Sequence, residues 1–228
     1  MPKQNPFRIG STGPEDWKSG LAQPEKQWRT GYSARSMAYA WETANGLPQE
    51  IAMPLREEFG ENPTPLLIAP EWTTPLPDGL PGSQSDVFSL VTVGAKTLAL
   101  CVEGKVDEPF GETVGTWLKK PSSARQPRLN DLCRLIGIQS PVEPSLRYQL
   151  FHRTASAVIE AQRFKCAYAA MIVHSFSPQQ RWFEDFAAFC DLLGINAVKP
   201  GKLYRSSGNS VIPLFLGWAG GDARFLEA

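Results

Sequence analysis

The stretch DVFSLVTVGAKTLALCVEGKV, residues 86–106, decides the expected fold, because its pattern predicts two β-strands joined by a short turn. Both halves are rich in β-branched and apolar residues, and Gly94-Ala95 lies between them. A two-residue loop that begins with glycine is typical of a type II′ hairpin turn. Residues 86–93 and 96–106 are therefore predicted to form an antiparallel hairpin.

The predicted turn also determines which residues face each other across the hairpin. Counting outward from the pair Val93 and Lys96 places Asp86 directly opposite Glu103. Lys105 shares their face, because side chains on a strand alternate between its two faces. Two carboxylates in this relation lie roughly 5 Å apart, and like charges directly opposite each other destabilise a sheet. A cation would relieve the repulsion, and Mg²⁺ is usually held by one or two carboxylates with water and phosphate oxygens.

Simpler explanations exist for the same residues. Asp86 follows a loop rich in glycine and proline, where an aspartate is common as a turn residue. Glu103 and Lys105 would also suit a strand face that is open to solvent. Their neighbours on that face, Cys101 and Ala99, are apolar or small, which favours a covered face.

The composition is that of one soluble globular domain. The chain has 228 residues, of which 42% are hydrophobic and 20% charged, as is usual for a single soluble domain. Within it we expect an irregular N-terminal arm over 1–32, a core over 33–176, and a C-terminal helix and strand within 177–228. Its formal net charge is zero, so no overall field attracts nucleic acid, although a local basic groove is compatible with a neutral total. No apolar signal core or run of ~18 apolar residues occurs, and a cytoplasmic protein without a membrane partner is expected.

Several kinds of site are disfavoured by the motifs that the chain lacks. The four cysteines form no CxxC pair, and with two histidines a zinc ribbon or finger is nearly excluded. Cys101, Cys166 and Cys190 lie in apolar contexts and are expected to be buried free thiols. No glycine-rich phosphate loop and no GxSxG nucleophile motif is found.

The remaining elements are predicted from periodicity, helix caps and glycine or proline stops. Before the hairpin we expect a helical turn near 15–20, a helix over 34–44 capped by Ser33, a helical segment over 48–58, and a strand over 64–68 with a loop over 70–85. A turn over 111–119 and helices over 129–136 and 145–164 follow the hairpin. The chain then continues with a strand over 167–176, a helix over 178–194 and a strand over 211–218. This order predicts an α/β (α+β) three-layer sandwich with a central mixed β-sheet.

The residues and the element order resemble the PD-(D/E)XK nuclease superfamily, the restriction-endonuclease-like fold of many restriction enzymes and recombination nucleases. Its members share an αβββαβ core, with a metal-binding Asp on the second strand and (D/E)-x-K on the third. Asp86, Glu103 and Lys105 match those positions, and the helix over 34–44 takes the place of the first helix. The resemblance covers about residues 33–176.

The chain departs from the superfamily at two points. Ser85 stands before the aspartate, where many members have proline. The following helix carries Tyr148-Gln149, which does not fit the QxxxY spacing of the exonuclease branch. The assignment to that branch is therefore unsupported, and Gln149 enters only as a candidate substrate contact.

The resemblance implies a hydrolase that cuts phosphodiester bonds as an endonuclease or exonuclease, acting on DNA or, alternatively, RNA, with Mg²⁺ or Mn²⁺ as cofactor. Asp86 and Glu103 would hold the ion, and the backbone carbonyl of Gly104 could add a ligand. Lys105 would orient or help deprotonate the attacking water and balance charge on the phosphate. Glu42 matches the accessory acid of some branches and could complete the shell of a second ion.

Arg147 and Arg153 are predicted to form a basic patch that faces the phosphate backbone, although a solvated helix face explains both arginines as well. A homodimer is one expectation, since cutting both strands of a duplex needs two sites. The alternative function is a catalytically inactive module of the same fold that binds nucleic acid or a protein partner. A structural or assembly protein, with proline-rich loops and tryptophans used in contacts, is a third hypothesis.

Overall fold

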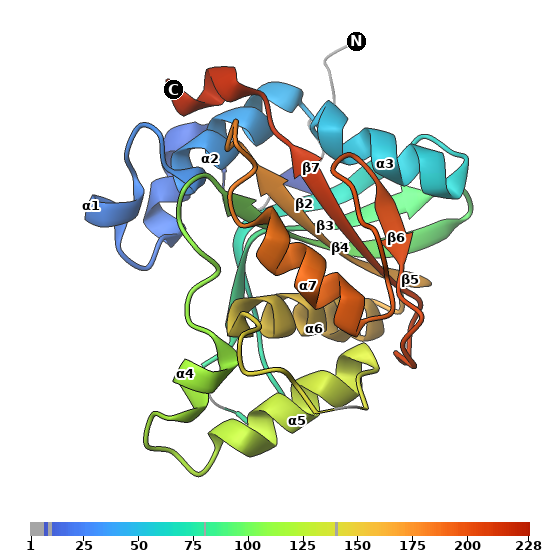
Figure 1. The fold of residues 1–228 in the computed structure, drawn as a ribbon. Helices are drawn as coiled ribbons and strands as arrows, with labels where there is room; N and C mark the ends of the chain where they lie inside the picture. The colour runs from blue at the N-terminus through green and yellow to red at the C-terminus, as the bar shows by residue number, and fades with distance from the viewer. Residues whose placement is uncertain (1–6, 9–10, 80, 140) are drawn as a thin grey trace.

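The computed structural model describes residues 7–8, 11–79, 81–139 and 141–228, and these residues are built around a seven-stranded mixed sheet (Figure 1). Its strands are β1 (Phe7–Arg8), β2 (Thr64–Thr74), β3 (Ser83–Val93), β4 (Lys96–Lys105), β5 (Tyr168–Ser175), β6 (Leu203–Arg205) and β7 (Leu214–Gly220). Their order across the sheet is β1-β2-β3-β4-β5-β7-β6. Strands β2, β3 and β4 form an antiparallel meander, whereas β5 and β7 run parallel to β4. Most of the first ten residues of the predicted arm lie outside the described residues.

Helices cover both faces of the sheet (Figure 1). The helical segments are η1 (Pro14–Gly20), α1 (Pro24–Gln27), α2 (Ser33–Ala44), α3 (Gln49–Phe59), α4 (Val114–Leu118), α5 (Arg125–Ile136), α6 (Tyr148–Arg163), α7 (Phe183–Leu192) and η2 (Ala223–Leu226). Helices α2 and α3 lie on one face, and α5, α6 and α7 lie on the other. The predicted α/β fold with helices on both sides of a mixed sheet is therefore confirmed.

Two apolar cores result from the alternation of side chains along the strands. On β3, Val87 and Val91 pack in the core under α2 and α3, whereas Phe88 packs in the core under α6. Strand β5 supplies both cores, since Met171 and Ile172 enter opposite ones. This double burial explains why its sequence is a continuous apolar run rather than an alternating pattern.

The predicted hairpin and its register are confirmed. Val93 pairs with Lys96, and the pairing continues without a shift to Val87 and Val102. Gly94 has φ +61° while Ala95 is not among the residues with positive φ, as a type II′ turn requires. One step further along this register, Asp86 faces Glu103.

Several strands differ from the predictions. Strand β1 lies in the segment expected to be an irregular arm, and β3 begins at Ser83, three residues before its predicted start. Strand β2 continues to Thr74, through the segment that was expected to be a loop. Pro70 is tolerated there because β2 lies near the edge of the sheet, where the described part of β1 pairs with Leu67 and Ile68 and not with Pro70. Strand β6 was not predicted, since a strand of three residues carries too little pattern to be distinguished from a loop.

Helix boundaries shift for local reasons. Helix α2 begins at Ser33, so Tyr32 occupies the N-cap position and Ser33 does not cap the helix. Helix α5 begins at Arg125 and α6 at Tyr148, each several residues from the predicted start. Helix α7 begins late because Trp182 takes a left-handed φ of +69°, which a continuous helix does not allow.

All four cysteines are buried and free, as expected for the three in apolar contexts. Burial raises the pKa of the Cys101 thiol to about 12 and that of Cys133 to about 11. Burial also raises the pKa values of Cys166 and Cys190. Because the thiolate is the reactive form, none of these thiols is placed to act as a nucleophile.

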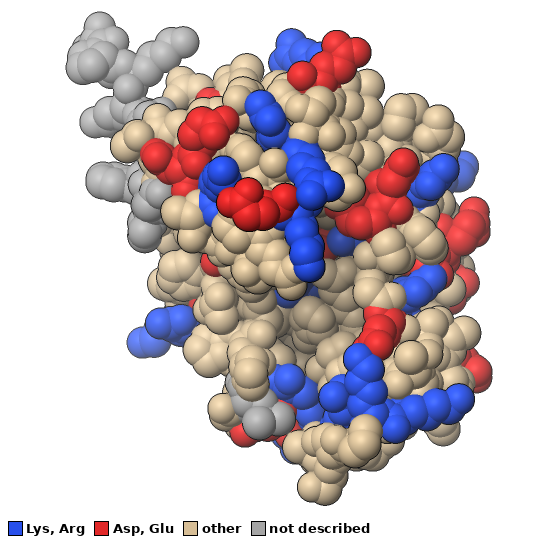
Figure 2. Space-filling view, turned by 90° about the vertical axis from the view of Figure 1, so that its left-hand side faces the viewer, with Lys and Arg blue, Asp and Glu red and all other residues tan. Residues whose placement is uncertain are grey.

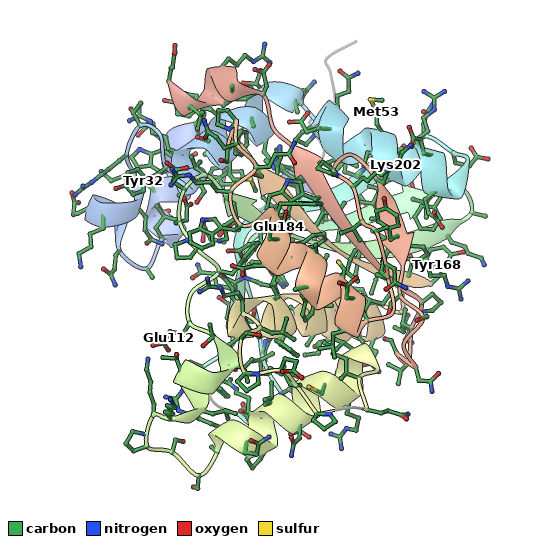
Figure 3. The ribbon with its side chains drawn as sticks, in the orientation of Figure 1. Tyr32, Met53, Glu112, Tyr168, Glu184 and Lys202 are labelled. Carbon is green, nitrogen blue, oxygen red and sulfur yellow. The ribbon has the colours of Figure 1, made fainter. Side chains whose placement is uncertain are left out.

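The surface carries scattered large apolar side chains. Met53 on α3 is 50% exposed and Tyr32 at the start of α2 is 44% exposed, and they lie on different parts of the molecule (Figure 3). No helix in the described parts of the chain has the length and apolar character needed to cross a membrane.

Candidate active site

The order of the main elements brings the predicted site residues to one face of the sheet. Helix α2 is followed by the meander β2-β3-β4, then by α6 and β5, with α3, α4 and α5 between them. Asp86 lies near the start of β3, and Glu103 and Lys105 lie at the end of β4. Helix α6 packs over this face and adds Gln149 and Arg153. The expected sequence of helix, three strands, helix and strand is therefore present.

Glu103 is the most completely bound carboxylate of the site. Its Oε1 accepts hydrogen bonds from Lys105 Nζ at 2.6 Å and from Gln149 Nε2 at 2.8 Å. Its Oε2 accepts from Arg153 Nε at 2.5 Å. Burial alone would raise the pKa of Glu103, but the charges of Arg153 and Lys105 and their hydrogen bonds outweigh burial and hold this pKa at about 2. Glu103 is therefore ionised at neutral pH.

The pKa of Asp86 is shifted in the opposite direction from that of Glu103. Its Oδ2 accepts a hydrogen bond from the backbone N–H of Gly104 at 2.6 Å. Burial and the neighbouring charge of Glu103 raise the pKa of Asp86 to about 7, although Lys105 and Arg153 oppose the shift. Two adjacent carboxyl groups thus differ in protonation near neutral pH.

Close packing explains the glycine at position 104, between Glu103 and Lys105. A Cβ atom at this position would lie 2.5 Å from Met37 Cγ, on α2, and 3.1 Å from Asp86 Oδ2. The absence of a side chain lets α2 approach β4 closely. It also leaves the Gly104 N–H accessible to the Asp86 carboxylate.

A third acidic residue, Glu71, was missed in the sequence. Strand β2 pairs Pro70 with Val87 and Trp72 with Ser85, so Glu71 lies across from Asp86. Glu71, Asp86 and Glu103 therefore form a row across three strands. The row could have been predicted only if β2 had been extended through its prolines.

Both the backbone conformation and the surroundings of the Glu71 carboxyl group are unfavourable. Its backbone takes φ +51°, a left-handed value that is uncommon for a residue other than glycine. Burial, followed by the charges of Asp86 and Glu103, raises the pKa of Glu71 to about 9. Among the described residues, none donates a hydrogen bond to its carboxyl group. Gly20 lies against it, since a Cβ there would be 2.8 Å from Glu71 Cβ.

Asp86 and Glu103 line a pocket of about 440 Å³, whereas Glu71 is not among its lining residues. Its base includes Asp86, Glu103, Lys105, Gln149 and Arg153, and its mouth includes Leu21, Lys26 and Gln27 of the arm, Tyr32, Ser33 and Ala34 at the start of α2, and Glu108, Pro109 and Gly111. Figure 2 shows a hollow between the arm and the part of the molecule that contains α4 and α5, with Lys and Arg side chains on both sides of it. The site is therefore accessible to a ligand.

Two of the predicted site residues are not brought to this pocket. Arg147 Nε pairs with Asp185 at 2.8 Å, and its NH1 donates to the Gly111 carbonyl at 2.9 Å, so it joins α6 to α7. Glu42 accepts hydrogen bonds from Ser11 Oγ at 2.5 Å and from Trp17 Nε1 at 2.9 Å, and so it holds the arm. Nine residues of α2 separate it from the pocket mouth at Ser33, about 13 Å along the helix axis.

The buried His174 lies on the other face of the sheet from Glu103. Its Nε2 is 2.9 Å from Glu50 Oε1, and Trp41 Nε1 donates to its Nδ1 at 3.3 Å. Both ring nitrogens thus have partners in the core under α2 and α3. His174 is explained by packing and does not join the carboxylate row.

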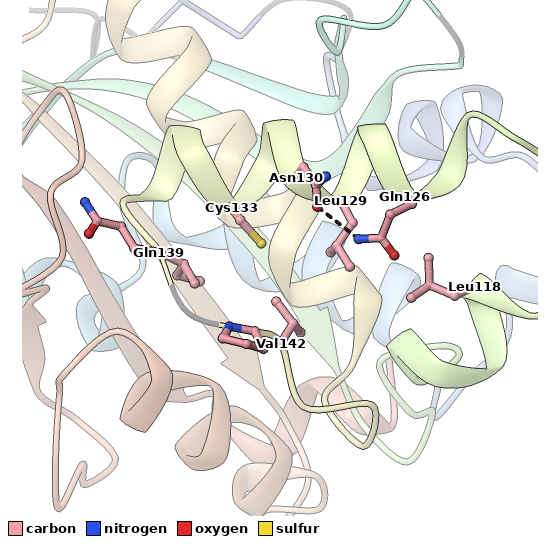
Figure 4. A pocket seen from close by; sticks show the side chains of 9 residues that line it. Leu118, Gln126, Leu129, Asn130, Cys133, Gln139 and Val142 are labelled. Carbon is pink, nitrogen blue, oxygen red and sulfur yellow. Dashed lines mark hydrogen bonds between the residues drawn. The ribbon is translucent and has the colours of Figure 1, made fainter.

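A second pocket of about 440 Å³ lies between α5 and the segment that follows it (Figure 4). Leu129, Val142 and the buried Cys133 form much of its wall, and Gln126 Nε2 donates to Asn130 Oδ1 at 2.9 Å along its rim. Among the described residues that line it, none is a carboxylate, histidine, lysine or arginine. The pocket at Asp86 is therefore the better candidate for a functional site.

The carboxylate row fits a divalent cation, although one change is needed. In the described parts of the chain, no group of three or more His, Cys, Asp and Glu residues is already arranged around a metal position. Asp86 and Glu71 nevertheless offer hard oxygen donors, and a bound dication would lower the pKa values that burial and the neighbouring carboxylates raise in both. Both oxygens of Glu103 accept hydrogen bonds, so Glu103 would have to release one donor to bind an ion.

Comparison with curated proteins and with solved structures finds no match to this chain. A family model described as a domain of unknown function, DUF6946, matches residues 10–223. This span contains the carboxylate row, the pocket and all of the sheet except β1. The chain therefore belongs to the DUF6946 family.

Proposed function

We propose that this protein is a metal-dependent phosphodiesterase of the nuclease type that hydrolyses DNA, with RNA as the alternative substrate. The observation that carries the proposal is the convergence of Asp86, Glu103 and Lys105 at the base of one open pocket. The resemblance to the PD-(D/E)XK nucleases, in these residues and in the order of the elements, supports the same reaction class.

Mg²⁺ or Mn²⁺, when bound by Asp86 and Glu103, would polarise a phosphate and lower the pKa of a bound water. Gly104 donates its N–H to Asp86 and so fixes the orientation of that carboxylate. Lys105, once released from Glu103, is placed to donate to the attacking water or to a phosphate oxygen. Arg153, which also donates to Ser83 Oγ at 2.9 Å, would remain in place and balance phosphate charge.

A cleavage assay tests this proposal directly. We expect Asp86→Asn and Lys105→Met to lower the rate of DNA cleavage in Mg²⁺ or Mn²⁺ on the order of 10²-fold or more, since each removes a group that acts on the reacting atoms. Lys120→Met is the matched control, because Lys120 is exposed and pairs only with Glu112 among the described carboxylates. Equal rates in all four proteins would reject the assignment.

The second candidate is a module of this fold that binds nucleic acid or a protein partner without cutting. The observation that favours it is the saturation of Glu103, whose two oxygens already accept from Lys105, Gln149 and Arg153. A nucleic acid that is bound with equal affinity in Mg²⁺ and in EDTA, and is never cleaved, would support this candidate over the first.

A further inference from the structure

A small cavity of about 170 Å³ lies where α4 ends and α5 begins. It is lined by Trp117, Ser122, Ala124, Arg125 and Arg128. The first turn of α6 separates it from the active-site pocket, because Tyr148 stacks on Trp117 with ring centroids 3.7 Å apart while the next residue, Gln149, reaches Glu103.

Arg125 brings a positive charge to this cavity that no described carboxylate pairs with. Its guanidinium carbon lies 4.8 Å from the centre of the Trp117 ring, so the ring fixes its position. Its Nε is buried and has no hydrogen-bond acceptor among the described residues. A buried donor of this kind is costly unless something accepts from it.

The other arginine of the cavity is already neutralised. Arg128 Nε pairs with Asp78 at 2.6 Å, and its NH2 donates to the Pro81 carbonyl at 2.7 Å. The cavity therefore holds one uncompensated positive charge, that of Arg125, rather than two. Its ligand should be an anion with a small number of charges.

Other hydrogen-bond donors at the cavity also favour an anionic ligand. Helix α5 starts at this cavity, and Ala124 at its N-cap position provides no side-chain cap, so the first amide N–H groups of the helix have no side chain to accept from them. The Ser122 hydroxyl also lines the cavity, and its oxygen accepts from the Ala124 N–H at 3.3 Å.

We infer that this cavity is a second phosphate subsite, which binds a phosphodiester group of a nucleic-acid strand through Arg125. The inference rests on the proposed function only in taking nucleic acid as the source of the phosphate. Because consecutive residues of α6, Tyr148 and Gln149, reach the two sites, we take their separation to be about one helix diameter, roughly 10–12 Å. That distance corresponds to about three nucleotides of a strand at 3.4 Å of axial rise each, so one strand can occupy both sites.

The test is the binding of a fluorescein-labelled 12-nucleotide DNA, measured by fluorescence anisotropy in EDTA over a range of salt concentrations. We expect Arg125→Gln to weaken binding about ten-fold and to reduce the slope of log affinity against log salt by about one. Arg134→Gln on the same helix is the control, because its side chain is 77% exposed and pairs with Asp131, and it should bind like the wild type.

Two further variants keep the result interpretable. Arg125→Lys retains the charge and should recover part of the affinity, and thermal unfolding should show that both Arg125 variants remain folded. An unchanged affinity and salt slope in Arg125→Gln, or equal losses in Arg134→Gln, would overturn the inference. Tight binding of inorganic phosphate without binding of the oligonucleotide would also overturn it and would identify a site for free phosphate.

The failure of this inference can be told apart from the failure of the proposed function. Asp86→Asn should abolish cleavage and leave the Arg125-dependent part of DNA binding intact. If the wild type binds DNA through Arg125 and never cleaves it, the result would support the phosphate subsite and reject the nuclease proposal. If the wild type cleaves DNA and Arg125→Gln has the same salt dependence of binding as the wild type, the nuclease proposal would hold and the phosphate subsite would be rejected.

Discussion

At the scale of single residues, three neighbouring carboxyl groups hold their protons very unequally. The pKa of Glu103 is about 2, that of Asp86 about 7 and that of Glu71 about 9. Glu103 is stabilised by two cations, whereas burial and repulsion from Glu103 act on the other two. Near pH 7 the row therefore carries fewer than three negative charges, and a bound dication would draw out the remaining protons.

The first prediction concerns Asp86. An acid whose pKa is raised on folding stabilises the protein below its unfolded value, near 3.8, and loses that contribution as the pH rises through about 7. Asp86→Asn keeps an oxygen that can accept from the Gly104 N–H and removes the charge. We expect it to raise the free energy of unfolding by about 4 kcal/mol at pH 8 and by less than about 1 kcal/mol at pH 4, as measured by guanidinium denaturation. A difference that does not vary with pH would contradict this explanation.

The second prediction concerns Glu103, for which the sign is reversed. Its lowered pKa means that its contribution to stability is present above the unfolded value, near 4.5, and is lost as the pH falls toward 2. Glu103→Gln would leave Lys105 and Arg153 buried without a counter-charge, so we expect a loss of about 3–5 kcal/mol at pH 7. Urea denaturation measures it, and the exposed Glu112→Gln, which breaks the surface pair with Lys120, should cost at most about 1 kcal/mol.

At the scale of elements, the contact between α2 and β4 depends on Gly104. The third prediction is that Gly104→Ala lowers the free energy of unfolding by about 1–3 kcal/mol, because the new methyl group would meet the buried side chain of Met37. Met37→Ala in the same chain should recover part of the loss. Gly220→Ala is the control in another strand, since nothing lies within 4 Å of a Cβ there. Equal stability of the two alanine variants in a denaturation series would argue against close packing at Gly104.

The elements that were predicted from the sequence are those with strong local signals. The turn at Gly94 and the alternation on both sides of it fix the register of the hairpin, and so Asp86, Glu103 and Lys105 could be placed before the structure. The continuation of β2 could not be predicted, because proline normally ends a strand unless the strand lies near the edge of a sheet. The position of β2 in the sheet cannot be read from its own residues, and for this reason Glu71 was not predicted to lie beside Asp86.

Residues on helices were harder to place than those on strands. Gln149 and Arg153 are four apart on α6 and both reach Glu103, but Arg147, at the N-cap position of the same helix, turns to Asp185. Glu42 lies on the expected helix but far along it from the pocket. The direction of a helical side chain depends on where the helix starts and how it is rotated, and neither is fixed by the spacing of the residues.

At the scale of the whole molecule, the site depends on both layers of helices. Helix α2 closes one side of the pocket mouth, α6 supplies Gln149 and Arg153, and the arm between Leu21 and Gln27 forms the rim. The pocket thus collects residues from the first and the middle part of the chain. Any ligand that binds it should stabilise the fold as a whole.

The fourth prediction follows from that linkage. Mg²⁺ or Mn²⁺ at 100 times its dissociation constant should stabilise the wild type by about 2.7 kcal/mol, which would raise the melting temperature by several degrees. Differential scanning calorimetry at pH 8 measures it, with EDTA to reverse the shift. Asp86→Asn should show little of this shift, whereas Lys120→Met should respond like the wild type. A melting temperature that is insensitive to both ions would contradict a cation site.

The burial of all four cysteines has a practical consequence for following these events in solution. Thiol-directed dyes and spin labels react with the thiolate, which the raised pKa values of the native cysteines suppress. A single cysteine placed at the exposed Met53, away from the pocket, would therefore take up a probe selectively. Site-specific labelling is thus feasible in the natural sequence background, without first replacing Cys101, Cys133, Cys166 or Cys190.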